Sequence, residues 1–409
     1  MTPTRRATFL GASALALTPR RATARPEPAI PVKIGILTEM SGTYAEDSGK
    51  GSVIAARMAI DDVVRDHPEL AVELIAGDAQ TKPDVASTLA RTWFDRDAVD
   101  AIFDVPVSNC ALAVATVTRE RNKAAVFNTS TSELTGKACS PNHIQWAYDT
   151  FALAGSTARA LLRDGGDTWF VIQADYTFGA TLAAEARAVI EAGGGKILGT
   201  VKHPFPGTTD FSSYLLSAQA SGAKIIGLAN AGTDAANCVK QAGEFGLTRG
   251  GARLATLQCL MPQIHGVGLE AAQGLYNTES FYWDLNEGTR AFSARWSPLN
   301  DGNKPSMIHA GCYAGVAHYL RAIAAIGAPA AKDGAAVIAQ MKRMDAADTL
   351  FGPGRIREDG RKIHDIHLFR VKTPAAAKTP WDLYDLIATT PGDQAFRPMA
   401  AGACPLVPA

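Results

Sequence analysis

Short apolar runs alternate with amphipathic stretches along almost the whole of the 409-residue chain. The apolar runs suit buried strands, and the stretches between them repeat apolar positions every three or four residues, as helices do. Short apolar strands that alternate with helices predict parallel sheets covered on both faces, and therefore an α/β fold. Strands are expected at 32–38, 72–76, 101–105, 125–128, 169–173, 197–201 and 225–229. Helices are expected near 52–66, 84–95, 111–121, 152–164, 180–192, 210–220, 234–245 and 309–325.

The alternation breaks at two segments that are both aromatic and polar, 146–150 and 278–286. We interpret them as crossings between two lobes, each built on its own sheet, with a third crossing near 348–354. A β-hairpin that turns at Asp359-Gly360 is expected over 353–371. The predicted division is lobe 1 at 31–147 and 280–348, lobe 2 at 148–279 and 349–385, and a C-terminal tail at 386–409.

The first 24 residues have the features of a secretory signal peptide. Arg5 and Arg6 precede an apolar stretch over 7–17, and an A-x-A cleavage site follows at 22–24. The string T-R-R-A-T-F-L resembles a twin-arginine signal with one extra residue before the phenylalanine. The alternative is a disordered basic tail. The signal peptide predicts export to the periplasm, with the twin-arginine pathway as a candidate route.

The charge balance argues against a nucleic-acid partner. The chain has 40 basic and 40 acidic side chains, and residues 1–24 contain four arginines and no acid. The remainder therefore has 36 basic and 40 acidic side chains, a net charge of −4, and no basic patch. No apolar run approaches the roughly 20 residues that span a bilayer.

Six cysteines are present, and none forms a C-x-x-C pair, so neither a zinc ribbon nor a redox motif is indicated. Some are expected to pair in an oxidising periplasm. Cys404 lies in a proline-rich tail that would gain most from being fixed, and Cys139, in a loop, is the preferred partner. The alternative is that most of the six are small buried apolar residues.

The opening segment, VKIGILTEMSGTYAEDSGKG, predicts a strand, a polar loop and a helix. In open α/β sheets, ligands bind outside the carboxyl ends of the strands. An exported α/β protein that begins in this way is expected to capture a solute. The loop also has glycines like those of a phosphate-binding P-loop, but its spacing differs and Gly51 stands where Ser or Thr is required. No nucleophile and base set is evident, so an enzyme is not expected.

Several strings occur in a characteristic order along nearly the whole chain: GILTEMSGTYA, VSNCALA, NTSTSELTG, DYTFG, NAGTDAANCVKQAGEFG, FYWDLNEGTRAF, GRIREDGR and PWDLYDL. In this order the chain resembles the type I periplasmic solute-binding proteins of ABC importers, the group of the leucine/isoleucine/valine-binding protein. The resemblance implies two Rossmann-like lobes joined by a three-strand hinge that close on a ligand. It also implies a permease in the inner membrane as partner, a monomer, and no cofactor or metal. The late strings are most similar to a subgroup for amino acids or aromatic carboxylates.

In lobe 1, the resemblance implies a carboxylate pocket at the ends of two strands. Hydroxyls and free backbone N–H groups at a helix start suit a carboxylate, because the donors and the helix dipole both favour negative charge. The alternative is that these residues only cap helices, and the two roles are compatible. The candidates are Tyr44, Ser108, Asn109, Thr129, Ser130 and Thr131.

In lobe 2, aromatic and polar side chains are expected to close over the ligand. Their alternative roles are helix capping for Asp175 and core packing for Phe178. Trp146 and Tyr148, at the first crossing, are candidates to line the cleft from the hinge. The alternative, expected for at least one of the crossing aromatics, is a buried hinge residue that never meets the ligand. The other candidates are Tyr176, Asn230 and Gln263.

Amino-acid binders of this family place an acidic side chain in lobe 2 to pair with the ligand's ammonium. The corresponding position here is Gln263 or a near neighbour in LQCLMPQ, a segment without an acid. A neutral amide cannot neutralise an ammonium that loses its water. Either the ligand lacks an α-ammonium, or Asp47 or Asp175 pairs with it, and a small carboxylate, aromatic or not, therefore gains over a branched-chain amino acid. The expected function is therefore capture of a small carboxylate, either a branched-chain type of amino acid or an aromatic or aliphatic acid. The alternatives are a sensory receptor of the same fold and an exported α/β enzyme.

Overall fold

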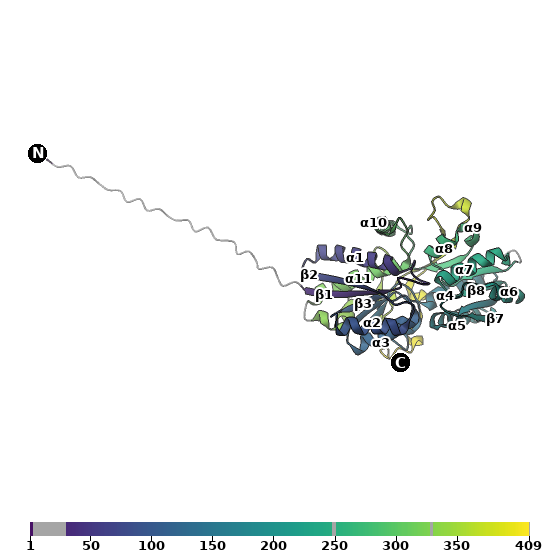
Figure 1. Cartoon of the computed structure of the whole chain (residues 1–409), viewed down its shortest axis with the longest axis horizontal. Helices are drawn as coiled ribbons and strands as arrows, with labels where there is room; N and C mark the ends of the chain where they lie inside the picture. Colours follow the sequence, from purple (N-terminus) through teal and green to yellow (C-terminus); the bar gives the residue numbers. More distant parts are fainter. Residues whose placement is uncertain (3–29, 248–250, 328–329, 409) are drawn as a thin grey trace.

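Two lobes stand side by side, each built around its own sheet (Figure 1). The computed structural model describes residues 1–2, 30–247, 251–327 and 330–408. The predicted signal peptide, apart from residues 1–2, lies outside the described residues. The first sheet has five parallel strands in the order β2-β1-β3-β4-β5: β1 Ile30–Thr38, β2 Leu70–Asp78, β3 Ala101–Asp104, β4 Ala124–Phe127 and β5 His143–Gln145. Its helices are α1 Gly49–Asp66, α2 Pro83–Asp95, α3 Ser108–Glu120, α10 Glu287–Trp296, α11 Met307–Ile326 and α12 Gly334–Arg343.

The second sheet is mixed, with order β14-β13-β10-β9-β8-β6-β7. Its first five strands along the chain are parallel, and the last two are added antiparallel at one edge. The strands are β6 Thr168–Ala174, β7 Lys196–His203, β8 Ile225–Ala229, β9 Arg253–Thr256, β10 Tyr276–Glu279, β13 Ile366–Val371 and β14 Tyr384–Thr390. The helices of this lobe are α4 Thr150–Arg163, α5 Thr177–Ala192, α6 Ser212–Ala220, α7 Gly232–Glu244, α8 Met261–Val267, α9 Leu269–Ala272 and α13 Gly392–Ala395.

Burial explains why the apolar runs predict the central strands. Every residue of β3, β4 and β8 is buried, because helices cover both faces of the sheets. The edge strand β7 alternates between exposed and half-buried residues over most of its length. The α/β prediction and all seven predicted strands are confirmed, as is the helix over 309–325, which corresponds to α11. The short strands β5, β9 and β10 carry polar residues and gave no apolar run.

The segment 353–371, predicted as one hairpin, contributes strands to two different sheets. Its first part forms a small two-stranded sheet, and its last part is β13 of the second sheet. Strands β11, Arg355–Ile356, and β12, Lys362–Ile363, pair antiparallel around Gly360, whose φ is +86°. This small hairpin lies against β5 of the first lobe, because Gln145 N–H donates to the carbonyl of Gly360 at 2.9 Å. The third crossing is therefore near 364–365, not near 348–354 as the sequence suggested. Strand β14 also continues past residue 386, so the tail begins later than expected.

The C-terminal tail crosses back from β14 of the second lobe to the first lobe. Cys404 forms a disulfide with Cys139, with the two Cα atoms 5.6 Å apart. Arg397 also donates to the carbonyl of Ser132 at 2.9 Å. The other four cysteines, Cys110, Cys238, Cys259 and Cys312, are buried and free. The tail thus joins the two lobes at a position next to the loop that follows β4.

Replacing Cys139 and Cys404 together by serine is expected to lower the free energy of unfolding by about 2–5 kcal/mol, because the bond closes a loop of 265 residues in the unfolded chain. Urea unfolding with and without dithiothreitol measures this. Reductant should destabilise the parent chain and leave the double variant unchanged. Equal stability of the parent and the variant under oxidising conditions would contradict the expectation.

Candidate functional site

Hydroxyl groups gather where β3 and β4 end, on the face of the first lobe that meets the second. Ser108 is the first residue of α3, and its hydroxyl lies 3.4 Å from that of Thr129. Thr129 in turn donates to the carbonyl of Pro106 at 2.8 Å. The Ser130 hydroxyl donates across to the side-chain oxygen of Gln258, in the second lobe, at 2.9 Å. These positions combine hydroxyls with the N-terminus of a 13-residue helix, which suits an anion.

A side chain from the neighbouring strand β5 holds the main chain that carries these hydroxyls. The amide of Gln145, at the end of β5, donates to the carbonyls of Thr129 at 2.8 Å and Thr131 at 3.0 Å. At the end of β3, Asp104 and Val105 have φ values of +80° and +51°, a left-handed conformation that a branched side chain rarely adopts. Such strain is typical of functional sites, where the surrounding structure must maintain it.

Aromatic side chains from both lobes form the next part of the interface. Tyr176 stacks on Phe205, with ring centroids 3.9 Å apart and an interplanar angle of 11°. Phe178 lies beside Tyr176, at 5.7 Å between centroids. From the first lobe, the Tyr44 hydroxyl hydrogen-bonds to the Tyr176 hydroxyl. The cluster joins a large apolar surface to a pair of hydroxyls.

The two lobes also touch through their main chains. The N–H of Thr233, at the start of α7, donates to the carbonyl of Thr43 at 3.2 Å. On the other side of the hydroxyl cluster, the Ser132 hydroxyl donates to Glu185 of α5 at 2.5 Å. The structure therefore has the lobes closed on each other. Tyr44 and Ser130 are buried between them, and Tyr176 and Phe205 are half-buried.

Buried carboxyl groups lie at the same interface. Burial raises the pKa of Asp47, in the loop before α1, to about 8, although Gln263 of α8 lowers it in part. Burial also raises the pKa of Glu279, at the end of β10, to about 8, and nearby Asp47 adds to that shift. Asp234 of α7 has its pKa raised to about 7 by burial. Burial therefore disfavours the ionised form of each of these groups.

The first crossing is fixed by a fully buried arginine. Arg361 donates to the carbonyl of Tyr148 at 2.7 Å and also to the carbonyl of Trp146. Its guanidinium lies 4.0 Å from the carboxylate of Asp149, which caps α4 by accepting from Ala152 N–H at 2.8 Å. These contacts tie the crossing to the hairpin of β11 and β12.

Comparison with known proteins agrees with this architecture. The family model of the periplasmic binding proteins matches residues 31–378. A periplasmic binding protein from Burkholderia mallei is 40% identical, with a TM-score of 0.87, over 92% of this chain and 99% of that one. A branched chain amino acid ABC transporter periplasmic ligand-binding protein from Burkholderia xenovorans is 38% identical, with a TM-score of 0.81 and coverage of 92% and 99%.

The chain belongs to the periplasmic binding protein family. Its fold is the type I fold, and the family provides the substrate-binding subunits of ABC transporters. A solute-binding protein from Rhodopseudomonas palustris in complex with p-hydroxybenzoic acid shares the fold, at 24% identity, a TM-score of 0.77 and coverage of 88% and 97%. A search of curated proteins gives no match. Among the described residues, no helix is long and apolar enough to cross a membrane.

In this periplasmic binding protein, the interface between the lobes includes most of the residues expected in the cleft. Ser130, Tyr44 and Tyr176 make direct contacts between the lobes. The Tyr148 hydroxyl lies near Ser130 and Gln258, which lower its pKa while burial raises it. The remaining cleft candidates near these contacts are Ser108, Thr129, Phe178 and Gln263. Asn230 is buried in the second lobe, where its side chain lies 3.4 Å from that of His203.

Two candidates in lobe 1 serve their own helices. The side chain of Asn109 accepts from the N–H of Cys110 at 3.0 Å, and that of Thr131 accepts from Glu133 N–H at 3.4 Å. Thr131 is the N-cap of the short 3-10 helix Ser132–Thr135, the role that the sequence left open as the alternative. Asn109 lies inside the first turn of α3, and its contact is local to that turn. Neither side chain contacts the second lobe through a hydrogen bond.

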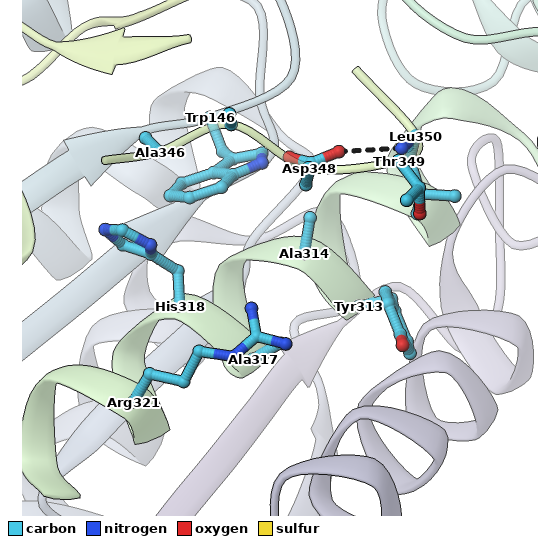
Figure 2. Close-up of a pocket in the computed structure, with 11 residues that line it drawn as sticks. Trp146, Tyr313, Ala314, Ala317, His318, Arg321, Ala346, Asp348, Thr349 and Leu350 are labelled. Carbon is cyan, nitrogen blue, oxygen red and sulfur yellow. Dashed lines mark hydrogen bonds between the residues drawn. The ribbon is translucent and has the colours of Figure 1, made fainter. Parts of the chain in front are cut away.

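Asp175 points away from the cleft, contrary to the prediction, whereas Trp146 is a buried aromatic of the hinge, the alternative that the sequence left open. Asp175 is 57% exposed and pairs with Lys202 at 3.0 Å, because it lies on the outer side of the strand end from which Tyr176 turns inward. Figure 2 shows the Trp146 indole beside His318, above α11, in a cavity of about 250 Å³ behind the hinge. The ring centroids of Trp146 and His318 are 5.4 Å apart. The hydroxyls at the ends of β3 and β4 do not line this cavity.

Three residues of the interface had no distinctive signal in the sequence. Gln258 follows β9, a strand that the apolar pattern did not predict, and Phe205 lies in a loop rich in proline and glycine. Glu279 falls in a segment interpreted only as a crossing. Two of these residues have distant partners, because 128 residues separate Ser130 from Gln258 and 105 separate Glu279 from Tyr384.

Proposed function

We propose that this periplasmic binding protein is the exported receptor of an ABC importer that captures a small carboxylate between its lobes and delivers it to a permease of the inner membrane. It acts as a monomer and performs no chemistry. The ligand is a branched-chain type of amino acid or an aromatic or aliphatic acid. Export follows the signal peptide over residues 1–24, with the twin-arginine pathway as the candidate route.

The observation that carries the proposal is the hydroxyl of Ser130 bonded across the cleft to Gln258. A ligand carboxylate that enters there replaces one hydrogen bond between the lobes with bonds to both of them. The N-terminus of α3 and the hydroxyls of Ser108 and Thr129 add favourable charge and donors at the same place. Because such a ligand contacts both lobes, it favours the closed form.

The aromatic cluster supports an apolar group on the ligand. The stacked rings of Tyr176 and Phe205, with Phe178 beside them, provide flat apolar surface a short distance from the hydroxyls. Their position at the contact with Tyr44 allows the same rings to meet the ligand when the lobes close. A molecule with a carboxylate at one end and a compact apolar body matches both features.

Replacing Ser130 with alanine is expected to weaken ligand binding by about 1–2 kcal/mol, or roughly 5–30-fold, because one hydrogen bond to the carboxylate is lost. The ligand is first found by thermal shift with leucine, valine, benzoate, 4-hydroxybenzoate and short aliphatic acids, and its dissociation constant is then measured by calorimetry. Ser217, exposed on α6, provides the control substitution to alanine. An unchanged dissociation constant in the Ser130→Ala variant would remove this residue from the site, and no stabilisation by any acid would overturn the proposed function.

A further inference from the structure

We infer that the cavity behind the hinge is a second binding site, separate from the cleft, and that it holds a short aliphatic carboxylate. The cavity has a volume of about 250 Å³ and lies between α11, the Trp146 indole and the segment 346–350 (Figure 2). Ser130, Gln258 and Tyr176, which join the lobes across the cleft, do not line it. A molecule held there is therefore distinct from the solute between the lobes.

Trp146 presents a hydrogen-bond donor that the protein does not satisfy. The side chain is fully buried, and its indole N–H has no hydrogen-bond partner among the described residues. Trp169 and Trp296, which are buried to the same degree, each donate to a main-chain carbonyl, at 2.8 Å and 3.1 Å. A buried donor without an acceptor is costly, so an acceptor that reaches this N–H from the cavity is expected.

Arg321 brings a positive charge to the same cavity. It lies on α11, is exposed, and makes no ion pair with the described acidic side chains. Figure 2 shows its guanidinium beside Ala317, in the space beneath the Trp146 indole. A guanidinium has five N–H donors in a fixed fork that matches the two oxygens of a carboxylate. A carboxylate between the arginine and the indole would therefore have donors on two sides.

The charges around the cavity sum to a positive value. Asp348 lines the wall, but its carboxylate already pairs with Lys362 at 3.0 Å. It also accepts from two main-chain N–H groups of the segment that follows it, at 2.8 Å and 2.7 Å. Burial, and then the charges of Lys362 and Arg321, lower the pKa of His318, which also lines the cavity. Two cations thus face one anion, and the cavity favours a ligand of negative charge.

The rest of the lining is mostly small and apolar, which distinguishes a carboxylate from an inorganic anion. Its apolar members are Ala314, Ala317, Ala346, Ala347 and Leu350. Sulfate and phosphate have oxygens on every side, and some of these would lie against alkyl groups without a donor. Chloride would match the charge and leave the apolar wall unfilled. A short carboxylate has both oxygens at one end and can place its alkyl group against the alanines.

The test follows the Trp146 indole N–H by NMR in ¹⁵N-labelled mature protein, its signal being assigned by its absence from Trp146→Phe. Titration with sodium acetate or sodium propanoate, at an ionic strength held constant with sodium sulfate, is expected to shift this signal until it saturates. Arg321→Gln should weaken the binding at least tenfold, because it removes the charge and the fork. Arg57→Gln, at an exposed arginine on α1 of the same lobe, is the matched control and should leave the binding unchanged.

The outcomes separate this site from the cleft and the carboxylate from other anions. Ser130→Ala should retain the acetate response of Trp146. Loss of that response would place the acetate in the cleft and overturn the second site, while the proposed function would stand. An equal response to sodium chloride would overturn the carboxylate class. A signal that no salt shifts to saturation, or an affinity unchanged in Arg321→Gln, would overturn the site itself.

Discussion

Replacing Gly232 with alanine is expected to hold the lobes apart and to weaken ligand binding by about 100-fold, or about 2.7 kcal/mol. Gly232 is the first residue of α7 and lies against the first lobe. A Cβ atom there would be 2.3 Å from the carbonyl oxygen of Thr43, and a main-chain atom cannot turn aside as a flexible side chain can. The closed form would then lose contacts between the lobes, so that the ligand could be held by only one of them.

The control for this prediction is Gly165→Ala. Gly232 has a φ of +57° and Gly165 one of +79°, so alanine strains the main chain at both positions. At Gly165 a Cβ would meet no atom within 4 Å, so only the strain remains. Both variants should lose similar stability, and only Gly232→Ala should lose affinity and show a larger radius of gyration with ligand in X-ray scattering. Normal affinity in Gly232→Ala would mean that the lobes need not approach this closely.

The contacts between the lobes also explain how the ligand controls closure. Ser130 and Gln258 hydrogen-bond directly, as do Tyr44 and Tyr176. A ligand between the lobes must replace at least the first of these bonds. The liganded closed form is therefore favoured only by the amount by which the ligand's contacts are stronger than the contacts that it replaces. A carboxylate offers two oxygens where Gln258 offers one, which makes the exchange favourable for an acid in particular.

The fold could be predicted from the sequence wherever burial was complete. Strands such as β3 and β8 are apolar throughout because helices cover both of their faces. The position of the third crossing could not be predicted, because the hairpin of β11 and β12 pairs with β5 through Gln145, a contact over more than 200 residues. Local turn signals identified the hairpin and could not show which lobe it joins.

A residue of the candidate site could be predicted only where the end of a strand was enough to determine the position of its side chain. Ser130 lies three residues after the end of β4, and its position at the edge of the sheet follows from the carboxyl ends of parallel strands. Asp175 and Tyr176 also follow a strand, yet one points to solvent and the other into the cleft. Neighbouring side chains of an extended chain point in opposite directions. An error of one residue in the predicted position therefore decides whether a side chain is placed in the cleft or in solvent. Gln258 could not be found, because its role depends on a contact with the other lobe.

Replacing Arg361 with methionine is expected to lower the free energy of unfolding by about 3–5 kcal/mol. The guanidinium is fully buried, and its loss would leave the carbonyls of Trp146 and Tyr148 without this donor. It would also leave the buried carboxylate of Asp149 without its cation. Burial lowers the pKa of Arg361 only to about 10, so the side chain is charged at neutral pH and its removal uncovers a negative charge.

Urea unfolding at pH 7 measures this loss, with Arg57→Met, on the exposed face of α1, as the control. The control should stay within about 0.5 kcal/mol of the parent protein. The loss in Arg361→Met should shrink at low pH, because protonation of Asp149, whose pKa burial raises, removes the unpaired charge. Similar stability of the two variants at pH 7 would show that the first crossing does not depend on this arginine. A large loss would show that the hinge, and not only the cleft, relies on contacts between distant parts of the chain.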